Sequence, residues 1–146
     1  MKIGIANDHR GYKLKTKIMP YLQKKGYEVI DYGCYSTDSV DYSDYGIMLG
    51  EKVRDKEVDF GIVICGSGIG ISIACNKVKG VRCAKVNNPR EAKLTRLDNN
   101  ANVVALNEKM HVFEAKDILD IFLTTKYQEE ERFQRRIDKI TKYEEK

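Results

Sequence analysis

Apolar positions along the chain follow two alternating spacings. Short runs rich in β-branched residues, such as Lys2–Ala6 and Phe60–Cys65, are typical of strands. Between such runs, apolar residues recur three or four positions apart, as at Leu14, Ile18 and Leu22, and this spacing predicts helices. Strands are expected over residues 2–6, 27–32, 60–65, 81–86 and 102–106.

Helices are expected over 12–25, around 45–53, from the glycine turn to about 76, from Asn88, around 115–122, and from about 128 to the end. Pro20 predicts a kink or boundary in the first of these. Asn88, Pro89 and Glu91 fit the N-cap, N1 and N3 positions of a helix start. Strand–helix alternation predicts right-handed βαβ units and a mainly parallel sheet covered on both faces.

The composition is ordinary for a soluble globular protein, with 42% hydrophobic and 33% charged residues in 146 positions. That length suits one domain with one core, so residues 1–146 are interpreted as a single domain. The net charge is only +4, and Lys and Arg are interleaved with Asp and Glu, which argues against a nucleic-acid face. No apolar run has signal-peptide or membrane-span length, so we expect a cytoplasmic protein without membrane contact.

The four cysteines differ in their settings. None forms a Cys-x-x-Cys pair, which argues against zinc and dithiol redox chemistry. Cys75 and Cys83 lie in apolar stretches and are interpreted as core residues, and Cys34 as incidental. Cys65 alone stands where a buried strand meets a glycine-rich turn.

The Cys65–Gly70 turn, with the sequence CGSGIG, could carry chemistry. Its three glycines let the backbone curl and expose N–H groups, and a predicted helix N-terminus follows, so the turn is suited to hold an anion. The same field favours the reactive thiolate form of Cys65, and the Ser67 hydroxyl could pass a proton. The turn matches neither a dinucleotide fingerprint nor a P-loop. Its residues alone leave an ordinary tight turn with a buried cysteine equally open.

Other polar residues stand beside predicted strand ends. Asp8 and His9 follow the first strand, at the edge where parallel sheets bind ligands, although Asp8 could simply cap the next helix. Asp98 and Asn99 open a polar stretch before the fifth strand that could be no more than a turn. His111 is interpreted as structural.

Arg132 and Arg136 lie one turn apart on the final predicted helix. Arg132 has Glu129 within reach, whereas Arg136 has no acidic residue three or four positions away. Such a pair suits an external anion such as phosphate, although a solvated charged face is the ordinary alternative. A thiolate base, backbone donors and cationic anchors together suit proton abstraction next to a carbonyl.

These residues resemble the type-B ribose-5-phosphate isomerase family, which includes the galactose-6-phosphate isomerase subunits. The resemblance covers essentially the whole chain, and its most specific part is the segment Val63–Ala74. The weaker markers follow in the same order: Asp8, His9 and Gly11; Asp41 and Tyr42; Asn76 and Lys77; Gly80–Arg82; Asn99; Ala101–Val103; Arg132 and Arg136.

The resemblance implies interconversion of D-ribose 5-phosphate and D-ribulose 5-phosphate through a cis-enediol(ate), without metal or organic cofactor. It implies a Rossmann-like three-layer α/β/α sandwich with a five-stranded parallel sheet. It also implies a homodimer or dimer of dimers with active sites at subunit interfaces.

The family's roles can be carried over residue by residue. The resemblance implies that Cys65 is the base and that Ser67, in place of the usual Thr, keeps a hydroxyl beside it. Sugar and enediolate contacts fall on Asp8, His9, Tyr42, Gly66, Gly68, Ile69, Gly70 and Asn99. Phosphate contacts fall on Arg132, Arg136 and Lys109.

Asp98 departs from the family pattern, which has His at this position as the acid that opens the furanose ring. An ionised carboxylate cannot donate a proton unless burial keeps it protonated. Three possibilities stay open. Asp98 is protonated or acts as a base on the anomeric hydroxyl, His9 opens the ring instead, or the enzyme takes mostly open-chain sugar and is slow on furanose. A Cys-bearing galactose-6-phosphate isomerase subunit, or a phosphosugar-binding protein that is inactive alone, is the alternative function.

Overall fold

The protein, described by a computed structural model over residues 1–146, is built on one parallel sheet of five strands in the order β2-β1-β3-β5-β4. The strands are β1 (Lys2–Asn7), β2 (Glu28–Asp31), β3 (Phe60–Cys65), β4 (Cys83–Lys85) and β5 (Val103–Asn107). All four strand pairings are parallel. β3 is therefore the central strand, as its apolar sequence predicts.

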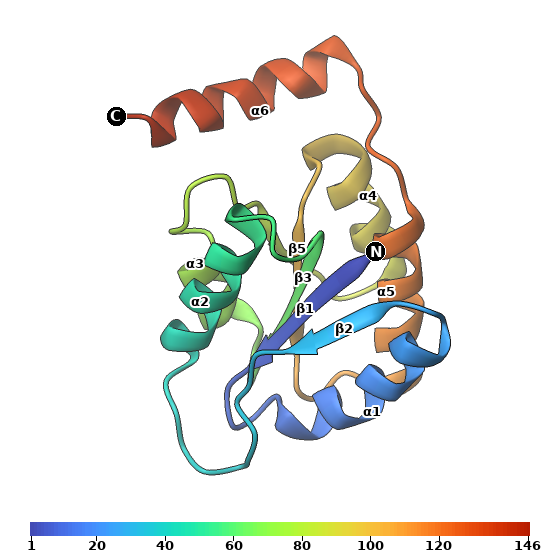
Figure 1. Cartoon of the computed structure of the whole chain (residues 1–146). Helices are drawn as coiled ribbons and strands as arrows, with labels where there is room; N and C mark the ends of the chain where they lie inside the picture. Colours follow the sequence, from blue (N-terminus) through green and yellow to red (C-terminus); the bar gives the residue numbers. More distant parts are fainter.

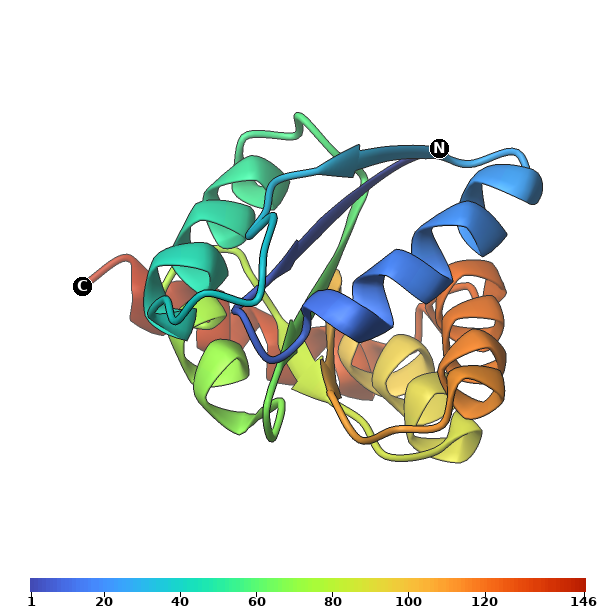
Figure 2. The same cartoon turned by 90° about the horizontal axis from the view of Figure 1, so that it is seen from below.

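Helices cover both faces of the sheet and give three layers (Figures 1 and 2). One face carries α1 (Tyr12–Lys24), α4 (Pro89–Asn99) and α5 (Val112–Thr124). The other carries α2 (Tyr42–Arg54) and the short α3 (Ile69–Cys75). The predicted α/β/α architecture is thus confirmed.

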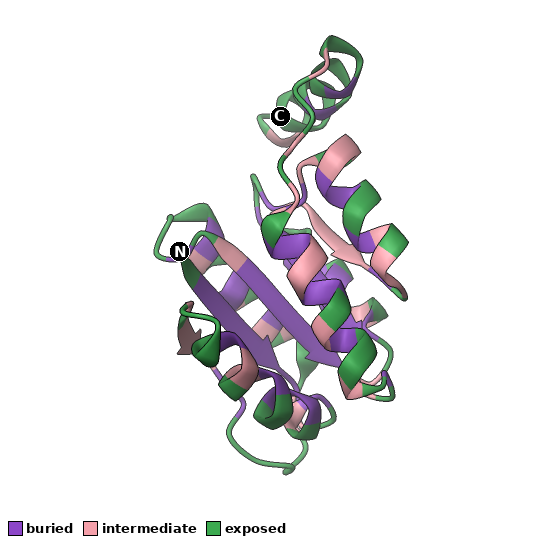
Figure 3. Cartoon of the chain, turned by 90° about the vertical axis from the view of Figure 1, so that its right-hand side faces the viewer, coloured by how far each residue is buried: buried purple, intermediate pink, exposed green.

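Two apolar clusters, one on each face of the sheet, form the core. Alternate residues of β3 serve the two sides, because successive strand residues point in opposite directions: Ile62 and Ile64 face α1 and α5, and Val63 faces α2 and α3. All three side chains are fully buried. Figure 3 shows the central strands buried along their length, whereas α6 (Glu131–Glu144) is exposed at most positions.

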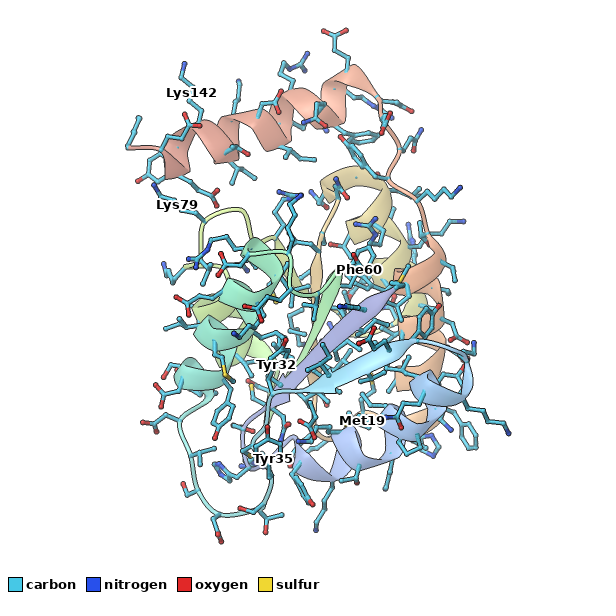
Figure 4. The ribbon with its side chains drawn as sticks, in the orientation of Figure 1. Met19, Tyr32, Tyr35, Phe60, Lys79 and Lys142 are labelled. Atoms are coloured by element: carbon cyan, nitrogen blue, oxygen red, sulfur yellow. The ribbon has the colours of Figure 1, made fainter.

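The helix α6 crosses the end of the sheet where the strands begin (Figure 1). Only Phe133 and Ile137 of α6 are buried. The backbone N–H of Gly80 donates to the Glu144 carboxylate at 2.9 Å and ties the far end of α6 to the loop after α3. In Figure 4, Lys142 on α6 and Lys79 in that loop lie at this amino end, and Tyr35 lies at the opposite, carboxyl end.

Element boundaries differ from the expected ones at a few places. α1 continues through Pro20 to Lys24, so of the two expected effects of Pro20, a kink or a boundary, the boundary is absent. β4 has only three residues, because the Val81 N–H is taken by a turn to the Val78 carbonyl. α6 begins at Glu131, later than the expected 128, because the Gln128 N–H donates to the Leu97 carbonyl. No helix has both the length and the apolar character needed to cross a membrane.

Candidate active site

Three strands bring the Cys65 loop and its neighbours to one edge of the sheet. In the parallel register Asn7 lies beside Ile64, and Cys65 lies beside Asn107. The turns that follow β1, β3 and β5 therefore meet at the carboxyl edge, where α/β proteins bind ligands. Figure 2 views the molecule from this side.

The turn after β1 is fixed by Asp8. Its carboxylate is buried and accepts the backbone N–H groups of Arg10 at 2.9 Å and Gly11 at 3.1 Å. Asp8 therefore holds the turn before α1 and is not the helix cap, because the N-cap of α1 is Gly11. His9 Nδ1 accepts the Val40 N–H at 3.1 Å. The Val40 carbonyl lies 3.2 Å from the same nitrogen, so the Val40 backbone orients the ring and leaves Nε2 available to a ligand.

The Cys65 thiol lies inside its own turn. The Gly68 N–H donates to Cys65 Sγ at 3.1 Å, a contact that favours negative charge on the sulfur. Ser67 Oγ accepts the Ile69 N–H at 3.1 Å, so its own O–H is available to a ligand oxygen. Cys65 is buried, whereas Ile69 beside it is exposed.

Tyr42 packs against this turn. A Cβ added to Gly70 would lie 2.7 to 2.9 Å from three atoms of the Tyr42 ring, so only glycine allows the ring to rest there. The contact places the start of α2 beside the start of α3. Tyr42, expected to bind substrate, therefore lies next to Gly70 at the same edge.

Arg10 and Glu108 form an ion pair at this edge that sequence reasoning missed. The Arg10 guanidinium donates through Nε to Glu108 Oε1 at 2.7 Å, and a second contact runs from Nη2. The hydrogen bond that Arg10 donates to Glu108, followed by the charge of Glu108, raises the pKa of Arg10. Arg10 follows His9 in the sequence, and Glu108 precedes Lys109, and both of these neighbours were expected site residues. This adjacency was the signal that could have pointed to the pair.

Lys109 is exposed in the turn after β5, and its N–H donates to Asn107 Oδ1 at 3.0 Å. It lines a small hollow of about 330 Å³ between that turn and α1, together with Lys13, Lys17 and His111. His111 Nδ1 accepts the Phe113 N–H as the cap of α5, in keeping with a structural residue.

The remaining expected site residues lie at the amino edge of the sheet. Asn99 and Arg136 line one groove of about 430 Å³ beneath α6, and Asp98 precedes Asn99 in the last turn of α4. Arg132 pairs with Glu130 at 2.8 Å, so the expected Glu129 is not its partner. Arg136 has no acidic partner and lies over the Phe133 ring.

Two arginines to which the sequence analysis gave no role shape the turn after Asn99. Arg82 Nε donates to the Asn99 carbonyl at 3.0 Å, and Arg96 Nη1 donates to the Ala101 carbonyl at 2.6 Å. Burial lowers the pKa of both Arg82 and Arg96, although both stay charged because the reference value is so high. They fix the backbone that carries Asp98 and Asn99.

The other cysteines play structural parts. Cys75 is fully buried, and a hydrogen bond with it, followed by burial, raises the pKa of Cys83 well above its usual value. Cys34 is buried; its backbone carbonyl accepts the ammonium of the buried Lys15, and its Sγ accepts from Asn7 Nδ2 at 3.5 Å. Nowhere do three or more His, Cys, Asp or Glu side chains gather as metal ligands would.

The chain matches the model of the family described as Ribose/Galactose Isomerase over residues 3–140. It is 41% identical to the ribose-5-phosphate isomerase B of Escherichia coli, with 99% of this chain and 97% of that protein covered. Its structure matches that of Clostridium thermocellum ribose-5-phosphate isomerase B with a TM-score of 0.97, at 47% identity and 99% and 98% coverage. A Mycoplasma genitalium ribose-5-phosphate isomerase B with bound ribulose-5-phosphate matches with a TM-score of 0.93, at 40% identity and 99% and 97% coverage.

Proposed function

Because the chain belongs to the ribose/galactose isomerase family, we propose that it interconverts D-ribose 5-phosphate and D-ribulose 5-phosphate. The observation that carries this proposal is the Cys65 turn, where a backbone N–H donates to a thiol at the edge of a parallel sheet. A base in that position suits an aldose–ketose isomerase that needs no metal.

In this proposal the Cys65 thiolate removes the proton from C2 of the open-chain aldose. The electron pair of that C–H bond forms the C1–C2 double bond of a cis-enediolate, and charge develops on O1. The same thiol returns the proton to C1, while the O2 proton leaves, and the ketose results. Ser67 Oγ, whose lone pair holds the Ile69 N–H, moves the proton between the two oxygens.

The enediolate oxygens would be held by backbone N–H groups of Gly66, Gly68, Ile69 and Gly70. Preorganised backbone donors stabilise developing negative charge without having to reorient during the reaction. His9 Nε2 and Asp8 would contact the sugar from the neighbouring turn, and Tyr42 would line the opposite side.

We further propose that a second copy of the chain completes the site. Arg132, Arg136 and Asn99 lie at the amino edge, away from Cys65, so one subunit does not bring phosphate-binding and proton-transfer residues together. Exposed apolar side chains occur near both edges and suit an interface between copies: Ile69 and Ile73 on α3, and Ile140 and Tyr143 on α6. The free Arg136 would then bind the phosphate of a sugar held by its partner.

Asp98 favours a second candidate, a phosphosugar-binding subunit that is inactive or slow alone. Asp98 is half-buried and makes no side-chain hydrogen bond, so no neighbour marks it as a proton donor. A protein of this kind would bind ribose 5-phosphate without isomerising it.

A coupled assay on ribose 5-phosphate with Cys65→Ala tests the proposal. We expect kcat to fall by about 10² to 10⁴-fold, the usual contribution of a general base, with KM little changed. Cys83→Ala removes a thiol on β4 that has no role in the proposed reaction and is the matched control, which should keep its activity. Undiminished turnover by Cys65→Ala would exclude Cys65 as the base.

A further inference from the structure

Arg10 lies directly over the backbone of the Cys65 turn. A Cβ placed on Gly66 would be 3.3 Å from Arg10 Nε and 3.5 Å from Arg10 Cζ, with no other residue so near. The guanidinium therefore covers the peptide that follows Cys65. Glu108 raises the pKa of Arg10 most, and attraction to the nearby Asp8 and Cys65 adds to the rise.

Both members of the Arg10–Glu108 pair are tied to the site through their backbones. The Arg10 N–H donates to Asp8 Oδ1, and the Glu108 N–H donates to the Cys65 carbonyl at 3.0 Å. Glu108 is largely buried, at 21% side-chain exposure, whereas Arg10 is 52% exposed. In this geometry a partly buried carboxylate orients an exposed guanidinium through a hydrogen-bonded ion pair.

We propose that Arg10 is a positioning residue that stabilises the thiolate of Cys65, and that Glu108 holds its guanidinium over the turn for this purpose. The inference rests on the proposed role of Cys65 as base. A positive charge beside a thiol favours its ionised form, and a thiol that is ionised at neutral pH removes a proton readily. Arg10 thus differs from Arg132 and Arg136, which lie at the other edge.

The other charged or titratable groups around the turn are carried by different elements and stay in place when Arg10 is replaced. They are Asp8 and His9 after β1, Tyr42 and Tyr45 on α2, Cys75 on α3, Cys83 and Lys85 on β4, and Lys109 after β5. A difference between wild type and an Arg10 variant therefore reports the Arg10 charge.

The test is an NMR titration of full-length protein labelled with ¹³C at cysteine Cβ, with Cys65 assigned from the Cys65→Ser spectrum. In Arg10→Gln the Cys65 thiol should lose its proton at a higher pH than in the wild type, because a nearby positive charge has been removed. Arg10→Lys keeps the charge and should restore most of the wild-type titration. The double variant Arg10→Gln/Glu108→Gln should titrate between wild type and Arg10→Gln, because the unpaired carboxylate is gone.

Arg54→Gln is the matched control, because Arg54 is an exposed arginine paired with a carboxylate, Asp55, at the amino edge. An unchanged Cys65 titration in Arg10→Gln, or an equal shift in Arg54→Gln, would overturn the proposal. A raised KM at an unaltered titration would also overturn it and assign Arg10 to substrate binding. The titration uses no substrate, so a wild-type protein without isomerase activity refutes the proposed function and leaves this result standing.

Discussion

At the scale of single residues, Gly68 contributes both to the backbone conformation of the turn and to the proposed chemistry. It adopts a left-handed conformation, with φ of 74°, at the N-cap of α3. A Cβ there would also lie 3.0 Å from the backbone carbonyl of Leu106. Because the same residue donates its N–H to Cys65 Sγ, any shift of this backbone moves the donor away from the thiol.

We expect Gly68→Ala to cost about 1 to 2 kcal/mol of unfolding free energy, the penalty for a left-handed L-residue, and to lower kcat as well. Urea denaturation and the isomerase assay measure the two effects. Gly26→Ala is the matched control: Gly26 has φ of 93° but has no atom within 4 Å of an added Cβ. It should lose similar stability and keep full activity, and a Gly68→Ala protein with normal kcat would contradict the expectation.

Asp98 stands where the family has a ring-opening His, so we expect it to limit the rate at which the furanose form is converted. Replacing it with a proton donor, Asp98→His, should raise kcat/KM for ribose 5-phosphate by at least about 10-fold if ring opening limits the reaction. Ribulose 5-phosphate cannot close a furanose ring through its phosphorylated O5, but its kcat/KM should rise by the same factor, because the equilibrium constant fixes the ratio of the two values. Asp98→Asn supplies no acid and should show no gain; an Asp98→His protein no faster than Asp98→Asn would rule out the ring-opening explanation.

At the scale of elements, periodicity and caps predicted most of the structure. The expected cap of α4 is present: Asn88 Oδ1 accepts the Glu91 N–H at 2.9 Å, behind Pro89 at N1. The apolar run Phe60–Cys65 is the central strand, as its lack of polar alternation indicates. The errors fell at element ends, where tertiary hydrogen bonds such as Gln128 to Leu97 override local preference.

The candidate site was less accessible to sequence reasoning than the fold. The turns after β1 and β3 could be placed at one edge, because parallel strands share a direction. The Arg10–Glu108 pair joins residues 98 positions apart, and no local sequence pattern predicts such a contact. The hydrogen bond from Arg82 to the Asn99 carbonyl, between residues 17 positions apart, was not predicted for the same reason.

At the scale of the whole molecule, the expected site is divided between two ends of the sheet. Cys65, Ser67 and Tyr42 gather at the carboxyl edge, and Asn99 and Arg136 at the amino edge. This division is what a site shared between two copies of the chain requires, and it can be tested by complementation.

Mixed oligomers of Cys65→Ala and Arg132→Ala/Arg136→Ala subunits, refolded together, should recover activity that neither variant has alone. Half of the dimers formed from an equal mixture contain both subunits, and one of their two sites is intact, so recovery should reach roughly a quarter of the wild-type rate. Mixing Cys65→Ala with Ser67→Ala is the control, because both lesions lie at one edge and no site is spared. Absence of recovery in the first mixture would show that the two edges do not meet in a shared site.

The strand order also governs how the chain reaches this structure. β3 pairs with β1 through Phe60 beside Ile3, and with β5 through Cys65 beside Asn107, so both neighbours of the central strand come from distant parts of the chain. Long loops must close before these pairings stabilise anything, and topologies of this kind fold more slowly than those with local contacts. The edge that carries Cys65 exists only when all three strands have joined, so the thiol acquires its surroundings late, with the completion of the sheet.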